Sequence, residues 1–479
     1  MPGYLTRNRM KVAGILAVFT LQQMVLADDA GPTPRNVVLI VTDDQRPDSI
    51  GALGNPYIRT PHLDRLTETG TSFTRAITAV PICVASRAEL LTGRDERFNG
   101  RDDFGFSPTP GAETFASTLA AAGYETCYVG KWHTRGRPSQ YGYTTTEGLF
   151  GSGGGRFPLT HPVDWKEMPV TGYRGWVFQD DDGNVDPAQG VGLTPNISER
   201  FAEAAIRYLR RRGSQPFLLH VNFTAPHDPL FVPEGYSGRY RAEAMPLPSN
   251  FRPEHPFDHG NRTGRDEVLY AFPRTIEETR AGLAVYYSVI EHLDEQVGRI
   301  LEELESQGLG EETLVIYTSD HGLAMGSHGL RGKQNMYEHS IGVPLILRGP
   351  GVPAGIKSAA QCYLRDLAPT ILEYCQADVP DSVHGSSLWP VLRGDQEGLH
   401  VAVYTHFRGV QRAIRTNEWK LIEYPEANRR QLFHLPSDPY ELRDRSENPA
   451  DQRILEQLAI RLENWAEEPG AASNSSDDE

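Results

Sequence analysis

Two acidic segments of the sequence follow directly on runs of apolar residues. Asp43–Asp44 comes after Asn36–Thr42. Asp320–His321 comes after Thr313–Ser319. Apolar runs with β-branched residues are typical of buried parallel strands, and ligands of such sheets bind beyond the carboxyl ends of the strands. Three carboxylates and an imidazole at one edge suit a hard cation such as Ca²⁺ or Mg²⁺ better than zinc, although either segment alone also fits a helix cap or a turn.

The elements that must position these residues alternate between strands and helices. A third apolar run, Pro216–Thr224, leads into His227 and Asp228. Apolar residues recur at helical spacing in three segments between or beside the runs: Thr60–Thr69, Glu199–Arg212 and Ile276–Gln307. The alternation predicts an α/β fold with a large, mostly parallel central sheet flanked by helices.

The hydrophobic pattern of the sequence changes near residue 399. Short alternating segments separated by turn residues follow: His400–His406, Val410–Arg415, Trp419–Tyr424 and Gln431–Leu435. They predict a smaller antiparallel sheet, with a helix over Asp451–Glu467 after it. We therefore expect a catalytic α/β domain over residues 36–398, a C-terminal antiparallel subdomain over 399–467 and a disordered tail over 468–479.

Two stretches fit poorly with regular elements. Residues 135–195 are rich in Gly, Tyr, Trp and Asp, and residues 228–274 are rich in Pro, Arg and His. Long loops in compact domains are usually functional, so both are candidates for the walls of a substrate cleft.

The N-terminus has the pattern of a secretory signal peptide over residues 1–27. Basic residues precede the mostly apolar segment Val12–Leu26, and small residues occupy the cleavage positions. A membrane anchor is the alternative, but this segment is short for a span and contains two glutamines. No other stretch is apolar enough for stable membrane insertion. The net charge of -16 argues against non-specific nucleic-acid binding.

The chain has four cysteines, too few for a disulfide framework. Cys127 lies in a predicted buried strand and fits an inert core thiol. Cys362 and Cys375 flank a helix-like segment, and a bridge between them is left open. Cys83 differs from the others in its neighbours.

Cys83 begins the segment CVASRAELLTGR, residues Cys83–Arg94. This segment resembles the signature of the formylglycine-dependent (type I) sulfatases of the alkaline-phosphatase-like superfamily, Cys-x-(Pro/Ala)-x-Arg followed by a helix that ends in Leu-Thr-Gly-Arg. Ala85 stands where Pro is commoner. Further segments resemble the family's motifs in the family's order, over nearly the whole chain after the signal: Val41–Gln45, Gly130–His133, Ala225–Pro229, Ser319–Gly322, Gly326–Gly329, Gly332–Lys333, Asp366–Thr370, Leu432–Leu435 and Asp438–Glu441.

The resemblance implies a chemistry centred on Cys83, whose thiol a formylglycine-generating maturase oxidises to an aldehyde. It implies a calcium ion held by five residues: Asp43, Asp44, Asp320, His321 and the modified Cys83. It also implies that cationic and imidazole groups enclose the sulfate: Arg87, Lys131, His133, His227 and Lys333. Such a cage lowers the barrier for a nucleophile that approaches an anion.

The family's mechanism divides the proton transfers among these residues. The aldehyde hydrates to a geminal diol, one hydroxyl attacks sulfur and the second allows the sulfate to be eliminated. The resemblance assigns deprotonation of the nucleophile to Asp320 or a neighbouring carboxylate, and deprotonation of the second hydroxyl to His133. It leaves His227 or Lys333 to protonate the departing alcohol.

Together these features predict a sulfuric ester hydrolase that acts on a sulfated carbohydrate, in the periplasm or after secretion. Aromatic residues of the long loops are candidates for stacking on sugar rings: Trp165, Trp176, Tyr141 and Tyr143. Four further residues are candidates for contacts with additional anions: Arg156, Arg174, His406 and Arg408.

Two other functional classes remain open at this stage. An arylsulfatase or a phosphonate or phosphate monoester hydrolase would use the same apparatus, and rates on matched esters separate these activities. A glycan-binding relative without catalysis is the other class. Against that class, every position of the expected apparatus holds a competent residue.

Overall fold

The computed structural model describes residues 35–99 and 108–468. The predicted signal peptide, residues 1–27, lies outside these ranges, as do residues 469–479 of the predicted disordered tail. No helix within the two ranges is long and apolar enough to cross a membrane.

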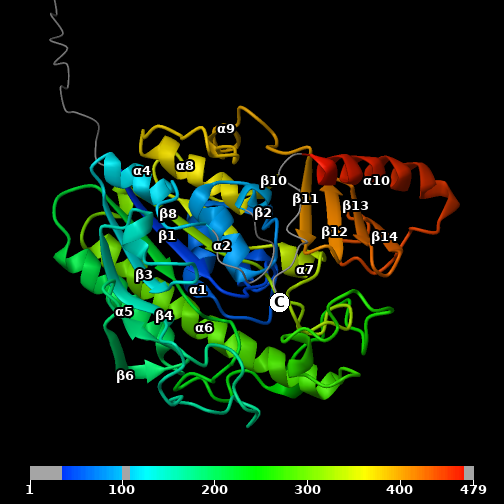
Figure 1. Ribbon diagram of the computed structural model, residues 1–479, viewed down its shortest axis with the longest axis horizontal. Helices are drawn as coiled ribbons and strands as arrows, with labels where there is room; N and C mark the ends of the chain where they lie inside the picture. The colour runs from blue at the N-terminus through cyan, green and yellow to red at the C-terminus, as the bar shows by residue number, and fades with distance from the viewer. Residues whose placement is uncertain (1–34, 100–107, 469–479) are drawn as a thin grey trace, which may run out of the picture. The chain divides into compact units, whose positions relative to one another are not determined.

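Ten strands of the described residues form the central sheet, in the order β10-β2-β9-β8-β1-β7-β3-β4-β5-β6 (Figure 1). They are β1 (Asn36–Thr42), β2 (Thr71–Ile77), β3 (Glu125–Lys131), β4 (Thr145–Ser152), β5 (Trp176–Gln179), β6 (Val185–Val191), β7 (Phe217–Asn222), β8 (Thr313–Ser319), β9 (Leu345–Arg348) and β10 (Ile356–Tyr363). The neighbours β8, β1, β7, β3 and β4 are parallel, whereas β9, β5 and β6 pair antiparallel. The predicted mostly parallel sheet is confirmed.

Helices cover both faces of this sheet, because alternate residues of each buried strand point in opposite directions. Val38 and Ile40 of β1 pack in one core cluster with α1 (Pro61–Thr69), α5 (Ile197–Arg211) and α6 (Ile276–Ser306). Val37 and Leu39 pack in a second cluster with helices on the other face. These helices are α2 (Cys83–Thr92), α4 (Phe115–Ala121), α8 (Leu367–Tyr374) and α9 (Trp389–Leu392).

The ends of the helices follow the local sequence. Pro61 occupies the first turn of α1, where a missing N–H costs nothing. The side chain of Thr275 accepts a hydrogen bond from the backbone N–H of Glu278 and caps α6. Gly93 ends α2 in the left-handed conformation, and its N–H donates to the carbonyl of Glu89. Three α-helices of the described residues are only four residues long: α3 (Glu96–Asn99), α7 (Glu338–Ile341) and α9.

The predicted C-terminal sheet is also present. Its strands pair antiparallel in chain order: β11 (Ala402–Phe407), β12 (Gln411–Thr416), β13 (Trp419–Tyr424) and β14 (Arg429–His434). The apolar side of α10 (Gln452–Glu467) packs on one face through Leu455, Leu458 and Leu462, and Figure 1 shows this helix running across the strands. The other face shares a core cluster with Ile77 and Tyr337.

The expectation of an irregular loop over residues 135–195 is wrong. Strands β4, β5 and β6 lie inside this stretch and extend the central sheet. Tyr141 and Tyr143 are also wrong as sugar-stacking candidates, because both are buried. The hydroxyl of Tyr141 donates to the carbonyl of Arg135, and that of Tyr143 bonds Nδ1 of His220. Residues 228–274, by contrast, hold two short 3₁₀ helices, η3 (Ala242–Ala244) and η4 (Glu267–Leu269).

The cysteines follow two patterns. Cys127 is buried in β3, as predicted. Cys362 and Cys375 are both free thiols, so no bridge joins them.

Candidate active site

The acidic segments meet at one edge of the central sheet because β1 and β8 are parallel neighbours in register. Thr42 pairs with Ser319, so Asp43 and Asp320 emerge side by side. The backbone N–H of Asp320 donates to the carbonyl of Thr42 at 3.2 Å. The two apolar runs alone predict this meeting.

Four side chains converge closely enough to hold a metal ion. Asp43, Cys83, Asp320 and His321 each offer one ligand atom, and these atoms lie within 4.8 Å of one another. Asp44 joins them through its backbone N–H, which donates to Oδ1 of Asp320 at 3.2 Å. Its carboxylate Oδ1 lies 3.2 Å from Nδ1 of His321. All five side chains are buried.

Two orphaned atoms in this cluster indicate that it fits a cation. Oδ1 of Asp43 and Nε2 of His321 are buried, and neither has a hydrogen-bond partner among the described residues. A buried polar atom without a partner carries a substantial desolvation penalty, which a bound cation removes. The carboxylates favour a hard ion, with His321 adding a nitrogen donor.

Helix α2 carries Cys83 and Arg87 to this cluster. Cys83 is the first helical residue and Arg87 lies one turn later on the same side of the helix. The Arg87 guanidinium donates from Nε to Oδ2 of Asp320 at 2.9 Å and from Nη1 to Oδ1 of Asn222 at 2.6 Å. It therefore joins the ends of β7 and β8 and fixes the orientation of Asp320.

Lys131 enters the site from the end of β3. Gly130 precedes it with φ of +90°, and a Cβ at Gly130 would lie 2.1 Å from the carbonyl oxygen of Asn222, so only glycine fits this close approach. The Lys131 ammonium donates to Oδ2 of Asp43. Burial alone would raise the pKa of Asp43, but Lys131, His227 and Arg87 outweigh it and hold that pKa well below the usual range.

Lys333 and His227 form the opposite wall. Nζ of Lys333 donates to both carboxylate oxygens of Asp44, at 2.9 and 3.2 Å, and lies 2.8 Å from Nε2 of His227. Burial would lower the pKa of Lys333, but Asp44 and Asp266 outweigh it and raise that pKa. Burial and the Lys333 charge lower the pKa of His227. Lys333 is therefore charged and His227 neutral, with Nε2 as the acceptor.

His133 also reaches the site. Burial and the Lys131 ammonium lower the pKa of His133, so its ring is neutral at pH 7. The edge of its ring meets Trp176, with 5.2 Å between centroids and 80° between planes. All ten residues predicted from the sequence to be catalytic or to bind the metal therefore gather at this one edge.

A family model described as sulfatase matches residues 35–377 of the chain. The chain belongs to the sulfatase family. A second model, described as the C-terminal region of N-sulphoglucosamine sulphohydrolase, matches residues 326–468 and so covers the four-stranded sheet and α10. The family and its named members identify this sulfatase as a sulfuric ester hydrolase.

Several known proteins are similar to this sulfatase along most of its length. An arylsulfatase of Clostridium perfringens is 31% identical over 85% of this chain and 89% of its own. An ulvan-active sulfatase of Formosa agariphila is 29% identical over 93% of this chain and 84% of its own. A solved structure, described as a complex with its substrate D-glucosamine-2-N,6-O-disulfate, superposes with a TM-score of 0.72. It is 23% identical and covers 92% of this chain and 100% of that one, which supports the fold.

Three further residues of this site were not predicted from the sequence. Asn222 ends β7 and bonds Arg87, and a polar residue at the end of an apolar run was the available signal. Asp266 lies 3.8 Å from the Lys333 ammonium, but its segment has no periodicity that marks it. Tyr173 donates a hydrogen bond to Asp43, which lies 130 positions earlier in the sequence, and no local pattern predicts that contact.

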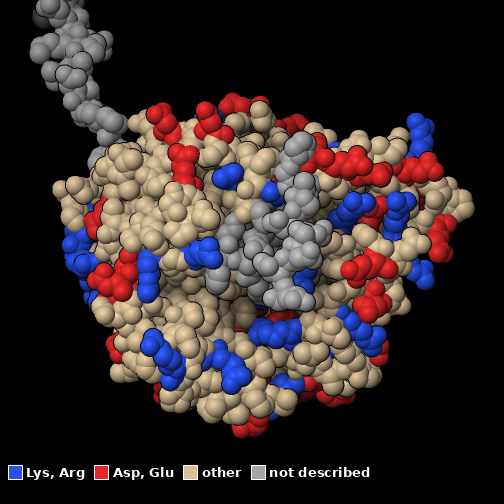
Figure 2. All heavy atoms as spheres, viewed as in Figure 1, with Lys and Arg blue, Asp and Glu red and all other residues tan. Residues whose placement is uncertain are grey.

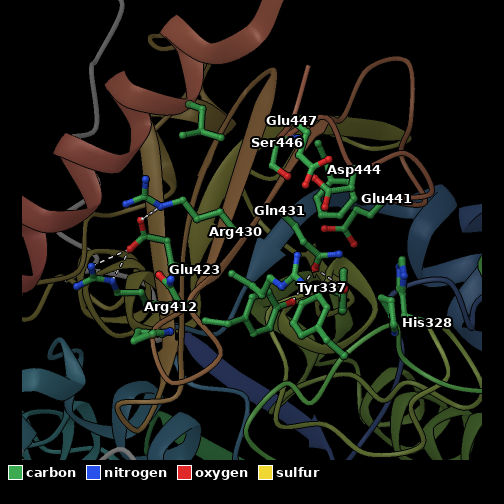
Figure 3. Close-up of a pocket in the computed structure, with 18 of the residues that line it drawn as sticks. His328, Tyr337, Arg412, Glu423, Arg430, Gln431, Glu441, Asp444, Ser446 and Glu447 are labelled. Atoms are coloured by element: carbon green, nitrogen blue, oxygen red, sulfur yellow. Dashed lines mark hydrogen bonds and ion pairs between the residues drawn. The ribbon is translucent and has the colours of Figure 1, made fainter. Parts of the chain in front are cut away.

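A separate groove of about 810 Å³ lies against the four-stranded sheet (Figure 3). None of the described residues that line it belongs to the predicted catalytic set. Three of its charged residues pair with one another, since Glu423 accepts Arg412 at 2.7 Å and Arg430 at 2.8 Å. The close-up shows Tyr337 and Gln431 between this ion-pair cluster and Glu441. The groove is therefore distinct from the carboxylate cluster.

Proposed function

We propose that this sulfatase removes sulfate from a sulfated carbohydrate, with a formylglycine made from Cys83 as its nucleophile and a calcium ion as its metal. The observation that carries the proposal is the convergence of Asp43, Asp320 and His321 on Cys83. A thiol that merely filled the core would not need three metal-ligating groups around it.

Asp43, Asp44, Asp320 and His321 would hold the calcium ion together with the modified side chain at position 83. Bound there, the ion and the formylglycine supply a nucleophilic oxygen of lowered pKa and positive charge beside the sulfate. The chain itself places the cations Lys131, Lys333 and Arg87 around the same point. Their field offsets the charge that a sulfate ester brings to a buried site.

The remaining assignments are two proton transfers. A neutral His133 is able to accept a proton from the hydroxyl at position 83, because its lowered pKa leaves one of its two ring nitrogens unprotonated. The pair of Lys333 and His227 holds a proton on Lys333 that faces Nε2 of His227. We assign protonation of the departing alcohol to this pair.

The carbohydrate assignment draws on the names of the relatives and on the surface. One relative is described as active on ulvan, and one solved neighbour is described as bound to a disulfated glucosamine. Figure 2 shows Lys and Arg side chains beside a hollow on the face viewed. Local basic groups on a chain of net charge -16 suit an anionic ligand.

We also propose that the protein is exported to the periplasm or secreted, and that a formylglycine-generating maturase of the host converts Cys83. The domain limits 36–398 and 399–467 remain part of the proposal. Among the suggested substrate contacts, Trp176 lies against His133 and Arg174 is exposed two residues before it. Both are therefore candidates for the wall of the sugar site.

The test is sulfate release by the mature protein after co-expression with the maturase. Peptide mass spectrometry checks whether Cys83 is converted, and the substrates are sulfated oligosaccharides, an aryl sulfate and an aryl phosphonate. Release from a glycan at a rate above that on both aryl esters supports the proposal. Turnover of the phosphonate alone by converted, calcium-loaded enzyme contradicts it.

A further inference from the structure

Tyr173 makes a direct contact with the metal cluster. Its hydroxyl donates to Oδ2 of Asp43 at 2.5 Å. The same oxygen accepts the Lys131 ammonium, whereas Oδ1 has no hydrogen-bond partner among the described residues. Two donors therefore occupy Oδ2 of Asp43, and Oδ1 remains available to bind a metal ion.

The backbone at Tyr173 is held in a conformation that its side chain disfavours. Its φ is +56°, in the left-handed region that bulky residues rarely adopt. It lies in the turn before β5, where the N–H of Trp176 donates to the carbonyl of Tyr173 at 3.1 Å. Strained residues of this kind persist where surrounding contacts fix them and occur at functional sites more often than elsewhere.

The ring of Tyr173 is fixed from three sides. It lies edge-on to Trp176 with 4.8 Å between centroids, and edge-on to His227 with 5.0 Å. Phe150 stacks on it at 6.2 Å. The Lys131 ammonium also lies over the ring, 5.3 Å from its centroid. These contacts leave the hydroxyl pointing to Asp43.

Packing alone does not account for a tyrosine at this position. Tyr208 belongs to the same core cluster, and its buried hydroxyl has no hydrogen-bond partner among the described residues. The Tyr208 hydroxyl therefore contributes little beyond volume. The Tyr173 hydroxyl, by contrast, donates a hydrogen bond to a predicted metal ligand, Asp43.

We propose that Tyr173 is a positioning residue that fixes the Asp43 carboxylate so that Oδ1 faces the calcium ion. The inference rests on the proposed metal centre and extends it by one residue outside the ligand set. Groups that orient a metal ligand typically contribute 10–100-fold to metal affinity. Tyr173→Phe keeps the ring and its packing and removes the hydrogen bond alone.

The experiment is a calcium titration of metal-free protein by isothermal calorimetry, with wild type, Tyr173→Phe and Tyr208→Phe. We expect Tyr173→Phe to raise the calcium Kd about 10-fold or more. Tyr208→Phe should leave that Kd unchanged. Both variants should melt near the wild-type temperature without calcium, because both keep the ring.

The outcomes separate this inference from the proposed function. If wild type binds calcium and Tyr173→Phe binds it with the same Kd, the positioning role is wrong while the metal centre stands. If wild type itself binds no calcium, the metal centre is wrong, and the role of Tyr173 fails with it. A Tyr173→Phe variant that melts early without calcium but binds with unchanged Kd also overturns the inference, because the hydroxyl then serves stability.

Discussion

Lys333 and His227 lie next to each other beside Asp44, with 2.8 Å between Nζ of Lys333 and Nε2 of His227. Nδ1 of His227 is occupied on its other side by the backbone carbonyl of Asp228, to which it donates. The imidazole is therefore neutral with its proton on Nδ1, and the mobile proton of the pair resides on Lys333. On the proposed assignment, Lys333 donates a proton to the leaving alcohol, and Nε2 of His227 accepts a hydrogen bond from the amine that remains.

The first prediction concerns this pair. His227→Ala should lower kcat on a sulfated sugar by about 10²–10⁴-fold, because a sugar alkoxide needs a proton to depart. The loss on 4-nitrophenyl sulfate should be much smaller, since a nitrophenolate departs without one. Steady-state rates on the two substrates measure the difference. His434→Ala, which removes a histidine of β14, is the control and should leave both rates unchanged. Equal losses on both substrates would refute the assignment.

Asp43 supplies the second prediction. Asp43→Ala should lose bound calcium and activity together, because the substitution removes the orphaned Oδ1 and leaves the Lys131 charge without its partner. Metal analysis of the purified protein measures the calcium content. Asp378→Ala removes an exposed carboxylate elsewhere and should keep the calcium. Full calcium content in Asp43→Ala is the result that excludes Asp43 as a ligand.

The third prediction concerns the nucleophile. Cys83→Ser, expressed with a maturase that is specific for cysteine, carries one hydroxyl where the diol carries two. The serine oxygen can take the sulfuryl group from a substrate, but no second hydroxyl is present to eliminate it, so the protein should stall as a sulfate ester. Intact-protein mass spectrometry after incubation with substrate detects the added group. Continued turnover by Cys83→Ser would contradict the proposed mechanism.

A fourth prediction concerns stability and pH at a site away from the metal cluster. Asp294 of α6 accepts the backbone N–H groups of His62 and Leu63 at the start of α1. Burial raises the pKa of Asp294 to about 7, and the nearby Asp64 and Glu291 add to the rise while the two backbone N–H groups oppose it. Its carboxyl therefore binds a proton more tightly in the folded chain than in the unfolded one.

The sign follows from the difference in bound protons. Between about pH 4 and pH 7 the folded state holds more of the Asp294 proton, so this group's contribution to stability is present at low pH and falls as pH rises. Asp294→Asn should remove that part of the decline, and its melting temperature should therefore fall less than that of wild type from pH 4.5 to pH 7.5. Asp378→Asn should follow wild type. Identical declines in Asp294→Asn and wild type would show that Asp294 does not titrate in this range.

The strands that frame the site could be predicted because their signals are local. Asn36–Thr42, Thr313–Ser319 and Trp419–Tyr424 form strands with the predicted bounds, since each is a run of buried or alternating apolar residues. Strands β4, β5 and β6 were missed. Of these, β5 and β6 sit at the end of the sheet and pair antiparallel. Pro187 and several exposed residues in β6 remove the usual pattern. Their pairing depends on tertiary contacts that no short window contains.

Some residues of the site could likewise be predicted from the sequence and others could not. Residues in motifs at strand ends were predictable, because parallel strands bring their carboxyl ends together whatever lies between them. Tyr173 was not, because the left-handed turn that aims its hydroxyl at Asp43 depends on the packing of Phe150, Trp176 and His227 around it. A positive φ at a tyrosine is visible only in the folded chain.

The central claim is that the cluster around Cys83 hydrolyses sulfate esters of sugars. The most direct measurement is free sulfate released from a panel of sulfated oligosaccharides and polysaccharides by fully converted, calcium-loaded protein. The account predicts release from at least one glycan, lost in Cys83→Ala and on removal of calcium. Silence on every glycan, together with turnover of an aryl phosphonate by the same preparation, would contradict it.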